Sequence, residues 1–191
     1  MLLSKKKIIY MLVVTILMSG INGVELFAAT NDESYAGNQL QQLGVLTGYS
    51  DGSLGLDRNI TRAEVATMMV RIQGYGSRNV SGETKVFSDI TNAHWAYQHV
   101  QNAYRLNMIQ GYPDQSFQPE ANIRYQEVVA IMVNTLGYKE QLLGEWPMNY
   151  INKAKEIGVI PANSQTDPAH IVTRGEMALI VWDTLLVKTT N

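Results

Sequence analysis

The sequence of 191 residues contains no cysteine. A chain without cysteine has no disulfide and no thiol to carry a lipid, so its folded form must rest on a hydrophobic core. Hydrophobic residues make up 46% of the chain, which is typical of a globular protein. Without its first segment the chain keeps about 160 residues, which is enough for one compact domain.

Charge is absent from residues 8–24. Lys5, Lys6 and Lys7 precede this apolar stretch, and Phe27-Ala28-Ala29 follow it. A basic start, an apolar run and small residues at a cut site are the pattern of a secretory signal peptide, which we place at residues 1–29. A retained anchor helix is the alternative, because 17 uncharged residues lie at the short limit for spanning a bilayer.

Basic residues are fewer than acidic ones once the signal peptide is removed. The remaining chain has 12 basic and 16 acidic residues, a net charge of −4. Such a protein has no general attraction for nucleic acid or for an anionic membrane. An anionic ligand would therefore have to be captured by local geometry.

Histidine is scarce, and the recognisable catalytic motifs are absent. The chain has three histidines, of which His94 and His99 are five apart and so lie on different faces of a helix. The loops at Asp51 and Asp114 have no acidic residue at the twelfth position that a calcium loop requires. We therefore predict no metal site, no cofactor and no enzymatic activity.

A repeat of 63 residues is present instead. It relates three pairs of landmarks: Gly48-Tyr49 and Gly111-Tyr112, Glu64 and Glu127, and Gly74-Tyr75 and Gly137-Tyr138. A third copy follows, because Trp95 and Trp146 each precede an isoleucine by 14 residues. We predict three units. They are a front-truncated unit one (30–78), unit two (79–140) and unit three (141–191), whose loop is two residues shorter and lacks the Gly-Tyr-x-Asp element.

Helical periodicity occurs in each unit. Val65, Met68, Met69 and Ile72 form an i, i+3, i+4, i+7 stripe, and the other two units repeat it. We therefore predict an all-α fold, in which three helix-loop-helix units pack as a pseudo-threefold bundle around a shared core. Residues 74–85 are rich in glycine and polar side chains and are interpreted as a linker between units one and two.

Several motifs in fixed order resemble the surface-layer homology domain of bacterial cell-envelope proteins. They are the Phe-x-Asp opening at 87–89, His94-Trp95-Ala96, Gly111-Tyr112-Pro113-Asp114 and the Thr-Arg-Ala-Glu signature at 61–64, and the resemblance extends over about residues 31–186. It implies a helical pseudo-trimer of three such repeats. It also implies a secreted protein whose inter-repeat grooves bind pyruvylated secondary cell-wall polysaccharide, holding it non-covalently at a Gram-positive-type wall or surface layer.

The start of the second helix in unit one combines a cap with an unexpected cation. Thr61 and Glu64 form a capping box, which unit three repeats. Arg62 and its equivalent Arg174 lie in the first helical turn, where the helix dipole disfavours a positive charge. An anion bound by the arginine and the helix N–H groups would explain them, and a pyruvyl carboxylate is such an anion. The alternatives are a solvated arginine or an ion pair with a neighbouring unit.

Unit two departs from this signature. Tyr125 occupies the arginine position, and Arg124 lies one place earlier. Either Arg124 substitutes from its shifted position or the groove of this unit has lost its anion contact, and we favour the loss. If the arginines only bind ligand, a variant with both Arg62→Ala and Arg174→Ala should stay folded and no longer sediment with cell walls.

Aromatic and turn residues complete the candidate carbohydrate contacts. The tryptophans either form a groove wall for a sugar ring or anchor the core at helix starts. The tyrosines and aspartates are turn residues first and ligand contacts second. Asp89 is interpreted as a helix cap. The candidates beside the three arginines are Trp95, Trp146, Tyr49, Tyr112, Asp51 and Asp114.

A second function remains open. Anchors of this kind usually carry an enzyme or a lattice-forming region, and we expect none in this sequence. The alternative to polysaccharide binding is therefore a structural or adaptor protein of the surface layer, acting through protein-protein contacts. In either case we expect no nucleic-acid partner, and no membrane contact after signal cleavage.

Overall fold

The structure is a computed structural model that describes residues 33–85 and 87–186. The expected signal peptide lies outside the described residues. Within them the chain is helical, with isolated β-bridges in place of a sheet. This confirms the all-α prediction. The elements are α2 (Glu33–Gln42), α3 (Arg62–Ile72), α4 (Tyr97–Arg105), α5 (Tyr125–Thr135), the 3-10 helix η1 (Lys139–Gln141), α6 (Met148–Glu156) and α7 (Arg174–Leu186).

None of the helices in the described part of the chain has the length and apolarity needed to cross a bilayer.

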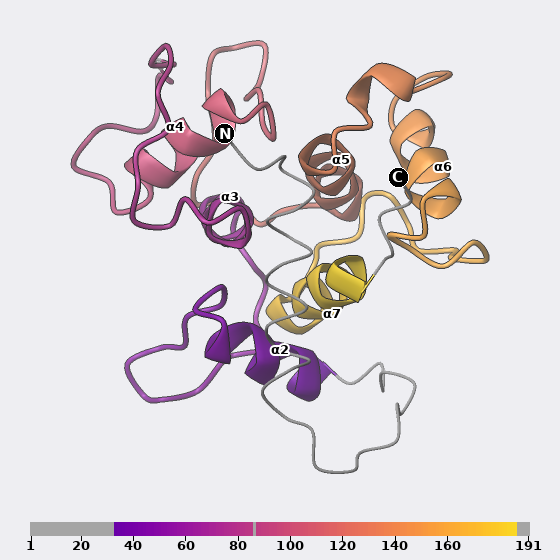
Figure 1. The fold of residues 1–191 in the computed structure, drawn as a ribbon, viewed down its shortest axis with the longest axis horizontal. Helices are drawn as coiled ribbons and strands as arrows, with labels where there is room; N and C mark the ends of the chain where they lie inside the picture. Colours follow the sequence, from indigo (N-terminus) through magenta and orange to yellow (C-terminus); the bar gives the residue numbers. More distant parts are fainter. Residues whose placement is uncertain (1–32, 86, 187–191) are drawn as a thin grey trace, which may run out of the picture.

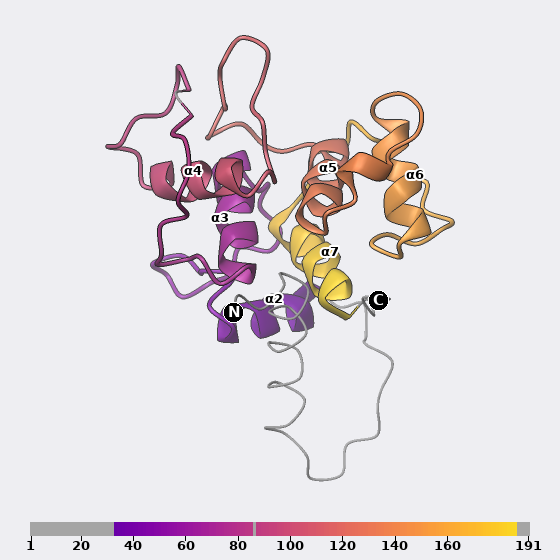
Figure 2. The ribbon, with the colours of Figure 1, turned by 45° about the horizontal axis from the view of Figure 1, so that its top comes forward.

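The second helices of the units surround the centre of the molecule. Figure 1 shows α3, α5 and α7 around the middle, with α4, α6 and α2 outside them. Each outer helix packs on the second helix of another unit: α4 on α3, α6 on α5, and α2 on α7. Figure 2 shows the same pairs from a second direction. Helices that are consecutive within one unit therefore belong to different packed pairs.

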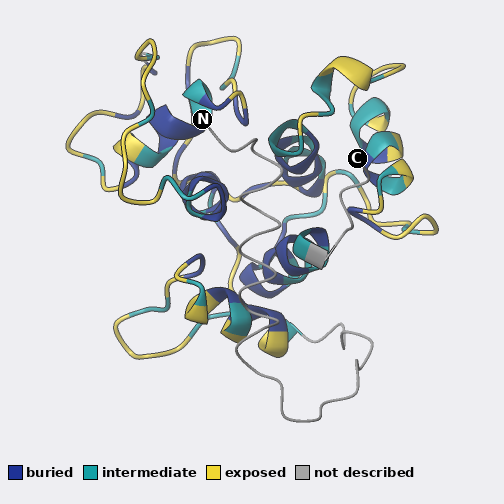
Figure 3. Cartoon of the chain, in the orientation of Figure 1, coloured by how far each residue is buried: buried dark blue, intermediate teal, exposed yellow. Residues whose placement is uncertain are grey.

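The predicted apolar stripes form the core. Val65, Met68, Met69 and Ile72 are all buried in α3, and the stripes of α5 and α7 contribute buried residues in the same way. Figure 3 shows this as dark blue central helices, whereas the outer helices carry exposed residues on one side. The methionines therefore act as packing residues, as their spacing indicates.

A closed ring of backbone hydrogen bonds joins the units just before the central helices. The N–H of Ile60 donates to the carbonyl of Val172 over 3.0 Å, that of Val172 to Ile123 over 3.1 Å, and that of Ile123 to Ile60 over 3.0 Å. All three side chains are fully buried. Each unit thus contributes one donor, one acceptor and one apolar side chain at the pseudo-threefold centre.

The segment predicted as a linker, residues 74–85, lies along α4. Gln101 is buried and accepts from the N–H of Lys85 over 3.0 Å while it donates to the carbonyl of Lys85 over 2.7 Å. The buried Asn102 accepts from the N–H of Val80 and donates to the carbonyl of Arg78. The backbone of residues 74–85 is thus hydrogen-bonded to α4 at several points, and we call this segment the strap.

Candidate functional site

The candidate site is built on the starts of the three central helices. In α3 the predicted capping box is present: the Thr61 N–H donates to Glu64 Oε2 over 2.9 Å, and the Glu64 N–H donates to Thr61 Oγ1 over 3.3 Å. Thr173 and Glu176 form the same pair of bonds at α7. These two predictions are confirmed.

The cap of α5 is only half of this arrangement. The Arg124 N–H donates to Glu127 Oε2 over 2.9 Å. An arginine side chain has no acceptor, however, and the Glu127 N–H bonds to the backbone carbonyl of Arg124 instead. In all three units one carboxylate oxygen of the glutamate is used by its own helix, which leaves the other oxygen for a second partner.

We call the contact between units one and two the one–two junction, and name the other two contacts in the same way. At the one–two junction, the second partner of the glutamate is an arginine of the other unit. Arg62 from unit one is buried, and its Nη1 donates to Glu127 Oε1 of unit two over 2.7 Å. Its Nε donates to the carbonyl of Phe117 over 2.8 Å. The guanidinium lies 4.5 Å from the ring centroid of Tyr112, which places it in contact with an aromatic face. The loop of unit two therefore encloses the arginine of unit one.

The three–one junction repeats the arrangement. Arg174 of unit three is buried and donates from Nη1 to Glu64 Oε1 of unit one over 2.7 Å. Its other nitrogens donate to the carbonyls of Leu54 and Thr47. The ring centroid of Tyr49 lies 4.8 Å from this guanidinium. The position of Tyr49 here thus matches that of Tyr112 at the one–two junction.

The helix N–H groups at these junctions are bonded within the protein. The first two N–H groups of each central helix donate to carbonyls of another unit's loop. The pairs are Arg62 to Ala121 and Ala63 to Pro119, Tyr125 to His170 and Gln126 to Pro168, and Arg174 to Arg58 and Gly175 to Leu56. The expectation that these N–H groups bind a ligand anion is therefore wrong. The arginines have the alternative role, an ion pair with a neighbouring unit, and their direct contact with a ligand stays a prediction.

The two–three junction lacks an arginine and has changed on both sides. Tyr125 is buried where the other units place arginine, and its hydroxyl lies 3.5 Å from Ser164 Oγ. Glu176 receives His170, with Nε2 and Oε1 2.8 Å apart. The side chain of Arg124 is exposed. The shortened loop of unit three has no tyrosine to contact a guanidinium. The arginine missing from unit two and the Gly-Tyr-x-Asp element missing from unit three would have contacted each other, so the two absences belong together.

Tyr112 connects the ion pair to the loop of unit two. Its hydroxyl donates to Glu127 Oε1 over 2.5 Å, the same oxygen that receives Arg62. Burial, followed by this hydrogen bond, raises the pKa of Tyr112 to about 12, and the charge of Arg62 acts in the opposite direction. The folded protein therefore holds the phenolic proton more tightly than the unfolded chain does.

This pKa predicts a loss of stability in alkali. A tyrosine titrates near pH 10 when unfolded, so the contribution of Tyr112 is complete below about pH 10 and is lost as the pH rises toward about 12. Urea titrations between pH 8 and 11.5 should show the difference in unfolding free energy between the wild type and Tyr112→Phe shrinking above pH 10. A difference that is constant with pH would contradict the assignment.

The turn residues predicted as ligand contacts are engaged in their own turns. Asp51 Oδ1 accepts from the N–H and the hydroxyl of Ser53, and these bonds lower the pKa of Asp51. Asp114 accepts from the N–H of Ser116, and hydrogen bonds to that serine lower its pKa too. Both carboxylates are exposed. Their turn role is confirmed, and a ligand contact stays a prediction.

The tryptophans expose large parts of their side chains. Trp95 is 58% exposed and Trp146 is 50% exposed, which does not fit core anchors. Trp95 stacks on His94 with centroids 5.7 Å apart. His94 Nε2 lies 2.8 Å from Glu120 Oε1, in the loop whose carbonyls bond the start of α3. Contacts within the described residues therefore place Trp95 beside the one–two junction.

Asp89 has a role that the sequence did not reveal. It was expected to cap a helix, but its two carboxylate oxygens accept from the N–H groups of Phe117 and Gln118, over 2.8 and 2.6 Å. Phe117 is buried, and its carbonyl accepts a hydrogen bond from Arg62. Asp89 therefore holds the part of the loop that receives the arginine. Asp89 and Phe117 are separated by 28 positions in the sequence, which explains why a local motif could not show this contact.

The described residues contain no group of three or more side chains able to hold a metal ion.

Comparison with known proteins identifies related sequences. A family model described as "S-layer homology domain" matches residues 38–66 and 86–129. The "Middle cell wall protein" of Brevibacillus brevis is 35% identical over 140 residues, covering 73% of this chain and 13% of the relative. The "Surface layer protein" of Brevibacillus choshinensis is 35% identical over 123 residues, with coverages of 63% and 11%. The "Cell surface protein" of Thermoanaerobacter kivui is 30% identical over 166 residues, with coverages of 81% and 21%. The chain thus spans only a small part of the length of these relatives.

Proposed function

The chain belongs to the S-layer homology family, and from this premise we propose that its inter-unit junctions bind a pyruvylated secondary cell-wall polysaccharide. The family and the relatives place the chain at the bacterial cell wall and surface, with a role in anchoring there. The glycan and its pyruvyl group are the proposed part. We propose no catalytic step for these units.

The observation that carries the proposal is the exposed tryptophan at the one–two junction. A sugar ring can lie on an indole face, and the indole N–H can reach a hydroxyl. Stacking on His94 fixes the orientation of the Trp95 ring, and the bond of His94 to Glu120 fixes both against the loop. Trp146 is the equivalent residue of unit three, and its ring contacts Tyr150 edge-on.

Exposed cations near the junctions would receive the carboxylate. Arg58 is exposed and lies 4.1 Å from the Tyr49 ring centroid at the three–one junction, and its backbone carbonyl bonds the start of α7. Arg124 is exposed at the start of α5, where its backbone pairs with Ile171 of unit three. In this proposal the buried Arg62 and Arg174 hold the junctions in shape, while the exposed groups contact the glycan. Asp51, Asp114, Tyr49 and Tyr112 would form the turn surface around it.

Several weak sites on one polymer would suffice for retention. Binding at a second junction becomes intramolecular once the first is occupied, so the combined affinity exceeds that of each site. The altered two–three junction therefore need not abolish attachment.

The proposal is tested by replacing Trp95 with alanine and measuring co-sedimentation with purified cell walls. Loss of one aromatic contact, about 1.4 kcal/mol, should weaken binding to each glycan chain about tenfold. Leu143→Ala is the matched control, because Leu143 is 87% exposed and apolar, and it belongs to the segment between η1 and α6, which supplies none of the junction contacts described above. The wild type should bind walls without pyruvyl groups as weakly as Trp95→Ala binds native walls. Equal binding by the wild type and Trp95→Ala would refute the assigned surface.

An adaptor role is the second candidate, and one observation favours it. Leu143, Trp146 and Met148 are large exposed apolar side chains within six residues of unit three. Exposed apolar residues that cluster are typical of protein-protein contacts. Retention on walls after extraction of the polysaccharide would favour this role over glycan binding.

A further inference from the structure

We propose a second binding surface, formed by the strap with α3 and α4, that takes an anionic glycan through Arg71, Arg78, Lys85 and Arg105. Arg71 marks its edge, because Arg71 donates to Thr47, whose carbonyl receives Arg174 at the three–one junction. The other three cations belong to the strap and α4, outside the junction contacts described above, and the surface does not depend on the pyruvyl group. It therefore goes beyond the function proposed above, and its test can fail while the junction proposal stands.

Charge is distributed unevenly along this acidic protein. Residues 65–113 carry four arginines and lysines against two acidic residues, Glu83 and Asp89. Residues 114–186 carry five basic and nine acidic residues. Asp89 is directed to the loop of unit two by its two backbone bonds. The strap and α4 are thus a basic region in a protein that is otherwise acidic.

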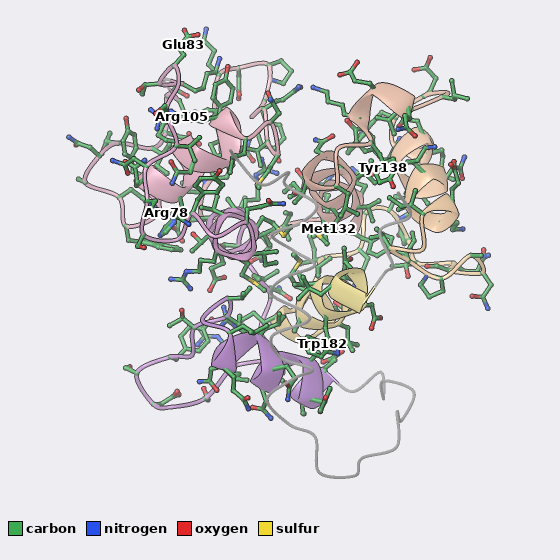
Figure 4. All side chains as sticks on the ribbon, viewed as in Figure 1. Arg78, Glu83, Arg105, Met132, Tyr138 and Trp182 are labelled. Atoms are coloured by element: carbon green, nitrogen blue, oxygen red, sulfur yellow. The ribbon has the colours of Figure 1, made fainter. Side chains whose placement is uncertain are left out.

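The arginines of this region are held by carbonyls and hydroxyls. Arg105 donates to the backbone carbonyl of Glu83 and to Thr84 Oγ1. Arg78 donates twice to the carbonyl of Gly74. Arg71 donates to the carbonyl of Val45 and to Thr47 Oγ1. Figure 4 shows Arg78, Glu83 and Arg105 in the same lobe as α4.

These bonds orient the guanidinium groups but do not neutralise them. Across residues 33–85 and 87–186, none of these three arginines forms an ion pair with a carboxylate. Arg62 and Arg174, by contrast, each face a glutamate at 2.7 Å. An oriented guanidinium without a carboxylate partner is suited to a carboxylate or phosphate brought by a ligand.

The charge of Arg71 reaches one titratable group on α4. Burial lowers the pKa of Arg71, and burial together with the nearby charge of Arg71 lowers the pKa of His99. Of the two shifts, only that of His99 reports a neighbouring positive charge, because burial alone accounts for the shift of Arg71.

The chemistry of the surface favours a glycan over a lipid membrane. The large apolar side chains that are exposed in the described residues are Tyr35, Trp95, Leu143, Trp146 and Met148, and all of them lie outside the strap. A membrane surface site would be expected to insert apolar groups beside its cations. The strap instead exposes Ser77, Asn79 and Ser81, which can hydrogen-bond to sugar hydroxyls.

Binding of labelled polymers at 50 and 300 mM salt tests the proposal. The probes are a polyuronate, which carries carboxylates, a phosphorylated dextran, neutral dextran, and vesicles with about one third anionic lipid. We expect the wild type to bind at least one anionic polymer but not dextran, and to lose most of this binding at 300 mM salt. The preferred polymer tells whether the ligand group is carboxylate or phosphate.

The diagnostic variant is Arg78→Gln with Arg105→Gln, which should weaken polymer binding about tenfold at 50 mM salt. Arg78→Lys with Arg105→Lys should keep most of the affinity. Lys139→Gln with Lys153→Gln removes the same charge from η1 and α6, outside the proposed surface, and should have little effect. Thermal unfolding monitored by circular dichroism must show that each variant is folded.

Three results would overturn the proposal. One is unchanged binding by the glutamine variant in its folded form. Another is an equal loss in the variant with Lys139→Gln and Lys153→Gln, which would mean that only net charge matters. The third is binding to vesicles in preference to both anionic polymers. Because pyruvyl groups are absent from all probes, none of these results affects the test of Trp95.

Discussion

Replacing Arg62 with alanine is expected to lower the free energy of unfolding by about 3–5 kcal/mol. The substitution leaves Glu127 Oε1 without its cation in a largely buried position and leaves the carbonyl of Phe117 without a donor. Removing one partner of a buried ion pair costs far more than the pair contributes on balance, because the remaining charge is poorly solvated. Urea unfolding followed by circular dichroism measures the change.

A double-mutant cycle tests the mechanism of this loss. Glu127→Gln removes the charge but keeps an acceptor for the Arg124 N–H, and the cycle joins Arg62→Ala, Glu127→Gln and the double variant. The double variant should be much less destabilised than the sum of the single variants. Strict additivity would contradict the pairing. Arg58→Ala, at an exposed arginine that contacts Tyr49, is the control and should cost no more than about 1 kcal/mol.

The buried ion pairs change the expectation for the double arginine variant, which the sequence alone predicts to remain folded. Arg62→Ala with Arg174→Ala removes the cation from both ion-paired junctions, so we now expect a strongly destabilised protein. Loss of wall binding in that variant would not identify a ligand contact. Substitution of an exposed residue such as Trp95 separates binding from folding.

Replacing Ile123 with alanine should lower the free energy of unfolding by about 2–5 kcal/mol. Ile123 is fully buried, and its backbone belongs to the ring of hydrogen bonds that joins all three units. The cavity would therefore open at a place where residues of all three units meet. The unfolding midpoint in urea reports the size of the effect.

The control for Ile123 is the same substitution at Ile157, which is only partly buried beside α6. It should cost clearly less. Circular dichroism and tryptophan fluorescence should give coincident unfolding curves for Ile123→Ala, because the three units share one core. If the two probes separated into successive transitions, the units would fold independently and the central ring would not be the joining element.

Local signals in the sequence were sufficient to predict the helices. The stripe at Val65, Met68, Met69 and Ile72 and the capping boxes at Thr61 and Thr173 depend on residues within two turns of each other. Such short-range patterns are set by helix geometry and survive in any packing. The repeat then transferred the prediction from one unit to the others.

The contacts between units could not be predicted in the same way. Arg62 and Glu127 are 65 residues apart, and Arg174 and Glu64 are 110 apart. Equivalent positions in a repeat do not say which unit is the neighbour, so the sequence left solvated, ligand-bound and ion-paired arginines open. One signal was available: the tyrosine at position 125 and the loop without Gly-Tyr-x-Asp occur on the two sides of the same junction.

The contacts of the strap could not be predicted, for a different physical reason. Glycine, serine and asparagine between two helices predict a linker, but they do not say what the linker contacts. The residues that bind it, Gln101 and Asn102, are polar residues within a helix, and polar helical residues are usually exposed. Here they are buried because their side-chain amides satisfy the backbone groups of the strap.

The ring formed by Ile60, Ile123 and Val172 joins the three units of one chain in the way that a cyclic trimer joins three subunits. Each unit offers an arginine or tyrosine on one side and a loop with a glutamate on the other, so the contacts are head-to-tail. Head-to-tail contacts either close into a ring or continue as an open filament. Closure after three units leaves neither a free head nor a free tail at the centre. The exceptional junction at Tyr125 also makes the three positions unequal, so that the order of the units around the ring is fixed.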